Sequence, residues 1–288
     1  MPLGRSGSES VKRRRQRVMM GRRAGRVMKV VSSALLFAAS GLSATGFAEA
    51  TSSAVPECRT GSMRQDSLAA VGERGEMLLA SGVRAVLDGI RWPVEDDAAV
   101  RAWILKHRDR TLTILPRGEL DRWGRAHVDA AVVDEAIDLA GGLIGEGLVY
   151  ADAGERDALC RPALMSLESA ARMADRGLWR SGVRESRDAA ALREATGRFV
   201  VAQGRVLNVG ERSARTYLNF TKRGEDGLTV TVSKRTWRQL RERGLSAATL
   251  RGRLVRVRGV VELWRGPTLD IASADMIELL DEERALRR

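Results

Sequence analysis

The chain has 288 residues, enough for one or two domains, and a formal net charge of +12. That charge does not describe one uniformly basic surface, because residues 1–50 carry ten Lys or Arg against two Asp or Glu. Residues 51–196 are net −4, whereas residues 197–288 are net +8. The change of sign predicts two domains with different surfaces and restricts an electrostatic argument for nucleic-acid binding to the second.

The first 50 residues have the order of an export signal. A stretch dense in arginine, Lys12 to Lys29, precedes an apolar stretch of small residues, Val30 to Phe47. Ala48-Glu49-Ala50 then fits an A-x-A cleavage site. We expect a signal peptide over residues 1–50 and a mature protein that is periplasmic or secreted, without a stable membrane span after cleavage. An uncleaved anchor is the alternative, which two glycines in the apolar stretch disfavour.

The chain contains two cysteines, Cys58 and Cys160. In an exported protein such a pair favours a disulfide, which over about a hundred residues stabilises by roughly 4–5 kcal/mol in the chain-entropy model. Two free buried thiols are the alternative, which the polar surroundings of Cys58 disfavour. The two histidines, His107 and His127, form no metal-binding spacing with the cysteines, so no metal site is predicted.

Residues 51–180 mix strand and helix patterns. Alternating apolar residues indicate strands, apolar spacings of three and four indicate helices, and Gly, Ser and Pro mark turns. In chain order we first expect a pair of strands within Ser67 to Ile90, at Met77–Leu79 and Val83–Ile90, with a Ser81-Gly82 turn between them. A helix from Glu95 through His107, a strand from Thr111 to Leu115 and a turn from Asp121 to Arg125 follow. The last elements are a strand-plus-helix region from Val128 to Tyr150, interrupted by Gly141-Gly142, and a helix from Ala163 that Gly177 caps.

The second half of the chain changes its pattern. Residues 181–196 are charged and predict a linker with a short helix from Asp188 to Thr196. In residues 197–288 the apolar period becomes two, which predicts strands. Five are expected, with a helix from Lys234 to Arg243 after the third: Phe199–Val209, Thr216–Phe220, Leu228–Val232, Arg253–Leu263 and Thr268–Ile271. This is the layout of an OB-fold barrel.

Four short motifs follow one another in the first half: Leu87-Asp-Gly-Ile-Arg-Trp-Pro93, Asp121-Arg-Trp-Gly-Arg125, Leu143-Ile-Gly-Glu-Gly-Leu148 and Arg176-Gly-Leu-Trp179. Their order resembles that of staphylococcal-nuclease-like (thermonuclease) domains over roughly Val71 to Trp179. The stretches at Gly197–Val206, Tyr217–Phe220 and Val255–Gly259 resemble C-terminal modules that accompany degenerate domains of this kind in secreted bacterial proteins.

The resemblance implies a fold class that is mainly β with helices (α+β). A nuclease-like OB-type barrel with helices would span residues 51–180, and residues 181–196 would link it to a second, small OB-like barrel over residues 197–288.

The resemblance also implies where a calcium-dependent nuclease centre would lie. The family's metal-binding Asp falls on Arg91, its neighbouring ligand on Trp92 and the ligand of an upstream turn on Gly75. Calcium requires hard oxygen ligands, which none of these side chains supplies. The general-base Glu falls on Val94. This centre is therefore expected to be degenerate.

Of the two arginines that would stabilise the phosphate, the first falls on Val86, and only the second survives, as the residual catalytic position Arg125. A shifted register would let Arg84 and Glu95 serve instead. A structural role for Arg125, in a salt bridge with Asp121, is the alternative.

We therefore predict an exported protein of the thermonuclease type that binds a protein or nucleic-acid partner without catalysis and without a cofactor. The alternative is an active nuclease that uses calcium to hydrolyse DNA or RNA. Nucleic acid would bind the basic C-terminal module through Tyr217, Arg256 and Arg258, since alternation with valines places both arginines on one exposed face. An envelope protein is the other expected partner.

Overall fold

The computed structural model describes residues 58–93, 97–133, 135 and 138–281, which belong to one compact unit. The predicted signal peptide, Val94 and Glu95 lie outside the described residues. Within the described part of the chain, no helix is long and apolar enough to span a membrane. The fold is mixed α+β, with more strands than helices.

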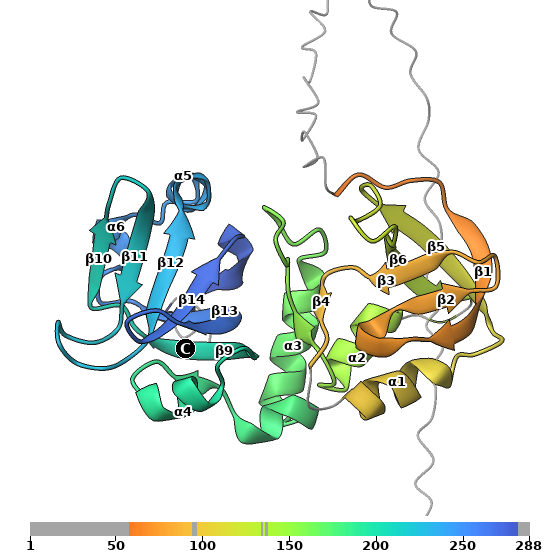
Figure 1. Ribbon diagram of the computed structural model, residues 1–288, viewed down its shortest axis with the longest axis horizontal. Helices are drawn as coiled ribbons and strands as arrows, with labels where there is room; N and C mark the ends of the chain where they lie inside the picture. Colours follow the sequence, from red (N-terminus) through yellow and green to blue (C-terminus); the bar gives the residue numbers. More distant parts are fainter. Residues whose placement is uncertain (1–57, 94–96, 134, 136–137, 282–288) are drawn as a thin grey trace, which may run out of the picture. The chain divides into compact units, whose positions relative to one another are not determined.

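Five strands of the first half close into a barrel in the order β1-β2-β3-β6-β5 (Figure 1). All neighbours are antiparallel except β3 and β6, which pair in parallel. On β6 every second residue points into the barrel, so that Ala126, Val128, Ala130 and Val132 are buried. The strands are β1 (Arg64–Val71), β2 (Met77–Leu79), β3 (Arg84–Leu87), β5 (Thr111–Arg117) and β6 (Ala126–Val132). A further strand, β1, thus precedes the two strands that the sequence predicts at Met77–Leu79 and Val83–Ile90.

Short helices and one small ribbon complete this half. They are the 3-10 turn η2 (Glu73–Gly75), α1 (Asp97–Leu105), α2 (Leu139–Gly145), α3 (Ala163–Met173), the 3-10 turn η3 (Gly177–Ser181), and the pair β4 (Ile90–Arg91) and β7 (Tyr150–Ala151). Asp138 caps α2 by accepting a hydrogen bond from the Gly141 nitrogen at 2.7 Å. The predicted interruption at Gly141-Gly142 is wrong, because both glycines lie inside α2. At Gly142 a β-carbon would come within 2.5 Å of the Trp103 ring.

Gly177 does not cap α3, as the sequence predicted. The helix ends at Met173 with Ala174 as its C-cap, and Gly177 begins η3 with φ +49°. There the backbones of Gly147 and Gly177 touch, and the Leu178 nitrogen donates to the Gly147 oxygen at 2.9 Å. The two Gly-Leu motifs of the sequence are therefore in contact.

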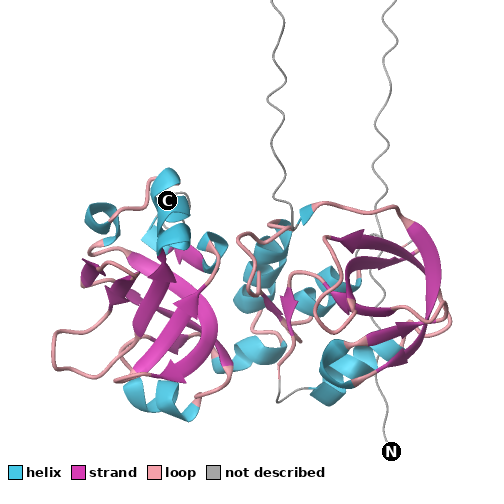
Figure 2. Ribbon diagram, turned by 45° about the horizontal axis from the view of Figure 1, so that its top comes forward, coloured by secondary structure: helices cyan, strands magenta, loops and turns pink. Residues whose placement is uncertain are grey.

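The second half forms a sheet in the order β10-β11-β12-β14-β13-β9-β8, with β15 also paired to β13. Figure 2 shows the strands of the molecule in magenta. Each predicted strand is present, although the first is divided in two, and the predicted helix is α5 (Lys234–Glu242). The strands are β8 (Arg184–Glu185), β9 (Phe199–Arg205), β10 (Asn208–Glu211), β11 (Arg215–Asn219), β12 (Thr229–Ser233), β13 (Leu254–Leu263), β14 (Pro267–Ile271) and β15 (Ile277–Leu279). The remaining helical turns are α4 (Ala189–Glu194), α6 (Ala247–Leu250) and η4 (Ala274–Met276).

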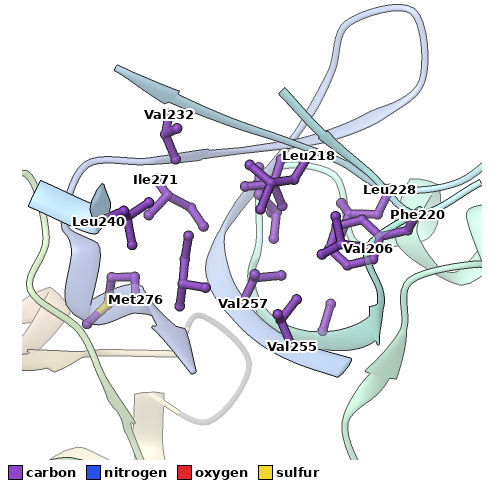
Figure 3. Close-up of a cluster of buried hydrophobic side chains, with 14 of the residues drawn as sticks. Val206, Leu218, Phe220, Leu228, Val232, Leu240, Val255, Val257, Ile271 and Met276 are labelled. Atoms are coloured by element: carbon purple, nitrogen blue, oxygen red, sulfur yellow. The ribbon is translucent and has the colours of Figure 1, made fainter. Parts of the chain in front are cut away.

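Alternation along these strands builds a second hydrophobic core. Leu218, Phe220, Val257 and Ile271 belong to the cluster of hydrophobic side chains in Figure 3 and are almost entirely buried. Because successive residues of a strand point to opposite sides, the residues between them form the outer face of the sheet.

The segment 181–196 belongs to this second core and is not a linker. Its β8 pairs in parallel with β9, and Leu192 and Ala195 are buried in the core. Its short helix is α4, capped by the Asp188 carboxylate, which accepts from the Ala191 nitrogen at 2.9 Å.

The predicted disulfide joins Cys58 to Cys160, with the two Cα atoms 5.2 Å apart. It connects the start of the described chain to the residues just before α3, across 102 positions of sequence. A covalent link of this length restricts the unfolded chain and so favours the folded one.

Candidate functional site

The positions where the family resemblance would place calcium ligands are occupied by an aromatic contact. The Trp92 ring lies against Gly75, so closely that a β-carbon on Gly75 would be 2.3 Å from its Cε3 atom. The indole is held there because its Nε1 donates to the Asp97 carboxylate at 2.7 Å. Trp92 therefore fills the space beside the backbone of Gly75.

Arg91, where the resemblance would place a metal-binding Asp, is engaged elsewhere. Its Nε donates to Oδ2 of the buried Asp152 at 2.8 Å, and its guanidinium lies 5.5 Å from the centre of the Phe199 ring. Among the described residues, no three His, Cys, Asp or Glu side chains are grouped so that they could hold a metal ion.

Arg125 pairs with Asp121, as predicted by the alternative in which Arg125 has a structural role. Its Nη2 and Nε both lie 2.8 Å from Oδ2 of Asp121, whose Oδ1 accepts from the nitrogens of Trp123 and Arg125 at 2.9 Å. Burial acts to raise the pKa of Asp121, but the hydrogen bonds from Arg125 and Trp123 outweigh it and lower the pKa below its ordinary value of 3.8. The carboxylate holds this turn together.

Arg84, the substitute in a shifted register, reaches the same turn from β3. Its guanidinium pairs with the Glu76 carboxylate and donates from Nη1 to the Trp123 oxygen at 3.1 Å. The structure thus brings Arg84 and Arg125 to one turn, each with a carboxylate partner of its own. Val86 lies opposite His127 in the β3–β6 pair.

The exposed face predicted for Arg256 and Arg258 is wrong. Their side chains alternate with valines as expected, but Arg258 is 1% exposed and Arg256 8%. Arg258 forms ion pairs with Glu168 of α3 and Glu278 of β15 and donates to the Ala151 oxygen at 3.1 Å, and Arg256 pairs with Glu278 at 3.2 Å. Burial acts to lower the pKa of Arg258, but the two carboxylates outweigh it and raise the pKa. Neither arginine is free to meet a ligand.

Tyr217, in contrast, lies on the outer face of the second sheet. It is directly paired with Thr231 of β12, which is paired with Asp270 of β14, so the three side chains form a row across adjacent strands. On the other side its partner on β10 is Gly210, where a β-carbon would meet nothing within 4 Å. The Tyr217 ring therefore has open space along the sheet.

A hairpin extends this row. Trp264, between β13 and β14, is 55% exposed and stacks on Tyr217 with ring centres 6.4 Å apart and an interplanar angle of 25°. The Arg265 guanidinium lies 5.3 Å from the centre of the Trp264 ring. Arg215 donates to the Thr231 hydroxyl at 3.2 Å and pairs with Asp270. We call these six residues the Tyr217 face: Tyr217, Trp264, Arg265, Arg215, Thr231 and Asp270.

Sequence reasoning selected only Tyr217 from this face. The signal for Trp264 was its place in a Trp-Arg-Gly-Pro turn between two strands, where a side chain cannot reach the core. The row of Tyr217, Thr231 and Asp270 depends on pairings among strands that are not all consecutive, which spacing along the chain does not reveal.

The sequence matches no protein-family model, and no curated protein matches it either.

Proposed function

We propose that the protein is an exported binding protein of the thermonuclease type without nuclease activity, and that single-stranded nucleic acid binds its Tyr217 face. The observation that carries the first part is the Trp92 ring against Gly75, with Arg91 paired to Asp152. An indole and a guanidinium replace the oxygen ligands that a calcium ion requires. The alternative, a calcium-dependent nuclease, would need both side chains to move away from these partners.

Strand order supports an OB-type interpretation of both halves. In the first, the barrel order β1-β2-β3-β6-β5 closes through a parallel pair. In the second half, only Val206 and Leu207 separate β9 from β10. Strand β9 pairs with β13, and β10 pairs with β11 on the other side of the sheet. If β9 and β10 are taken as one bent strand, that strand closes a barrel with the same strand order as the first. OB-type barrels bind oligonucleotides on the face of their second and third strands and on adjoining loops, which correspond here to β11, β12 and the Trp264 hairpin.

The chemistry of the Tyr217 face favours a single-stranded ligand. Bases stack on exposed aromatic rings while cationic side chains meet the phosphates. Tyr217 and Trp264 supply adjacent rings, Arg265 and Arg215 supply guanidiniums, and residues 197–288 are net +8. Each stacked base contributes about 1–3 kcal/mol of binding free energy.

The nuclease proposal is tested with the mature protein on single- and double-stranded DNA, with calcium and with EDTA. We expect no calcium-dependent cleavage. Cleavage that EDTA stops and that Arg125→Ala abolishes would contradict the non-catalytic assignment and would favour the shifted register with Arg84.

The ligand proposal is tested by fluorescence anisotropy with labelled oligothymidylate at several salt concentrations. We expect calcium-independent binding that weakens steeply with salt. Trp264→Ala should weaken it by about tenfold, the equivalent of 1.4 kcal/mol. Trp123→Ala removes an equally exposed indole from the first half and serves as the matched control, with no expected effect. Absence of binding at low salt, or equal loss in both variants, would overturn the assignment to the Tyr217 face.

A further inference from the structure

The Tyr217 face contains a carboxylate whose hydrogen bonds all end on one of its two oxygens. Asp270 Oδ1 accepts from the Thr231 hydroxyl at 2.7 Å and also pairs with the Arg215 guanidinium. Within the described part of the chain, no other group bonds to this side chain, which is 44% exposed. Oδ2 is therefore accessible to a ligand, and the two bonds to Oδ1 fix the direction in which it points.

Strand pairing places this oxygen on the same row as the aromatic ring. Tyr217 pairs with Thr231, and Thr231 pairs with Asp270. Because paired strands lie about 4.8 Å apart, two such spacings, roughly 10 Å, separate the Cα atoms of Tyr217 and Asp270. A purine base stacked on the Tyr217 ring is long enough to extend over Thr231, so its edge approaches Asp270.

The chemistry of single-stranded DNA restricts what a carboxylate on this face can contact. Phosphate and sugar oxygens inside the strand only accept hydrogen bonds, so every donor belongs to a base. A second carboxylate, Glu262 of β13, is exposed and points to the same side of the sheet, because it pairs with Thr268, two residues before Asp270. Two negative charges at this end of the row disfavour phosphates, which leaves it to the edges of bases.

We propose that Asp270 makes the Tyr217 face selective for guanine, an inference that rests on the proposed binding of single-stranded nucleic acid there. Guanine presents donors on two neighbouring atoms, N1–H and the N2 amino group, with the acceptor O6 beside them. Asp270 Oδ2 would accept from both donors. Arg215, whose guanidinium carries five N–H groups, would donate to O6. Thymine instead flanks its single donor, N3–H, with two oxygens that repel a carboxylate.

The experiment measures fluorescence anisotropy of the full mature chain with short labelled strands that differ only at one central base. The first strand is all thymine, the second carries one guanine, and the third carries one hypoxanthine, which lacks the N2 amino group. We expect the guanine strand to bind about fivefold more tightly than the thymine strand, at the lower end of what a well-placed base contact discriminates. The hypoxanthine strand should lie between them.

Asp270→Asn tests the direction of the hydrogen bonds. Because the oxygen of the new amide must still accept from Thr231 and Arg215, its nitrogen takes the place of Oδ2, and an acceptor becomes a donor. The preference for guanine should disappear or reverse, while the thymine strand still binds. Asp175→Asn removes one negative charge from an exposed position outside the Tyr217 face and is the matched control, with no expected change in the preference.

The outcomes separate this inference from the proposed function. Equal binding of the guanine and thymine strands, or an Asp270→Asn variant that keeps the preference, would overturn the selectivity and leave single-strand binding in place. If none of the strands binds at low salt, the proposed function fails and the selectivity fails with it.

Discussion

Arg258 of β13 and Arg215 of β11, on the Tyr217 face, belong to the same sheet, yet they have opposite environments. The Arg258 side chain is 0% exposed and lies between Glu168 and Glu278, whereas the Arg215 side chain is 43% exposed beside Asp270. Both strands alternate apolar and polar residues. The difference lies in what covers the outward side of each strand: α3 and β7 supply partners to Arg258, whereas Arg215 and Asp270 on β11 and β14 remain partly exposed.

This difference separates structural from ligand-binding arginines. A guanidinium that is fully desolvated and paired with two carboxylates cannot exchange them for phosphate without a large free-energy cost. Arg258 also joins residues far apart in sequence, since Glu168 lies 90 positions before it. Arg215 and Arg265 keep contact with solvent, where partners can be exchanged at little cost.

The largest expected effect is on the buried cluster. Arg258→Met leaves Glu168 without its closest cation in a fully buried position, and breaking such a pair costs about 3–5 kcal/mol. Arg265→Met, on the open face, should change the free energy of unfolding by no more than about 0.5 kcal/mol. Urea unfolding of both variants measures the contrast.

A double variant separates two causes of this loss of stability: the missing ion pair and the buried carboxylate that is left unpaired. Arg258→Met with Glu168→Leu removes the unpaired carboxylate and should recover part of the stability. If Arg258→Met alone lowers the free energy of unfolding by less than about 1 kcal/mol, Arg258 does not have the structural role that distinguishes it from Arg215.

A smaller effect is expected at Gly177, where backbone segments touch. Its φ of +49° is strained for alanine, and the added β-carbon would lie 2.3 Å from the Gly147 oxygen. The φ alone costs about 1–2 kcal/mol, and displacement of the turn at Gly147 adds to this. Gly244→Ala is the matched control, because Gly244, just after α5, has φ +80° and open space around its β-carbon position. Gly177→Ala should lower the melting temperature more than Gly244→Ala does; equal losses would mean that the contact with Gly147 relaxes freely.

In this molecule the sequence predicts local secondary structure better than it predicts which side chains are buried by elements that are distant in the chain. Period-two alternation located the strands of the second half, and a pair of cysteines in a chain expected to be exported predicted the bridge from Cys58 to Cys160. The burial of Arg256 and Arg258 could not be predicted, because their partners are distant in sequence: Glu168 lies 90 residues before Arg258, and Glu278 of β15 pairs with both arginines.

The two errors at residues 177 and 181–196 have similar causes. A glycine after a helix usually indicates a cap, but the contact between Gly177 and Gly147 is made by two distant turns. The charged segment before β9 resembled a linker, because few of its residues are apolar; among them Leu192 and Ala195 are buried in the second core.

The smallest expected effect concerns the carboxylate that holds the Trp123 turn. The folded pKa of Asp121 is below its ordinary value of 3.8, since hydrogen bonds to the charged form outweigh the opposing effect of burial. A carboxyl group with a lowered folded pKa contributes stability that is present above its unfolded pKa and is lost as the pH falls through the folded value. Asp121→Asn should therefore destabilise the protein at pH 7, and the difference from the parent should shrink as the pH falls below about 4. Asp175→Asn changes an exposed Asp that has no part in this turn and provides the control for the loss of one negative charge. Unfolding free energies from urea titrations at each pH measure the gap. A gap that stays constant down to acid pH would mean that the Asp121 hydrogen bonds do not depend on its charge, and the turn would then owe its rigidity to Gly124 and the backbone alone.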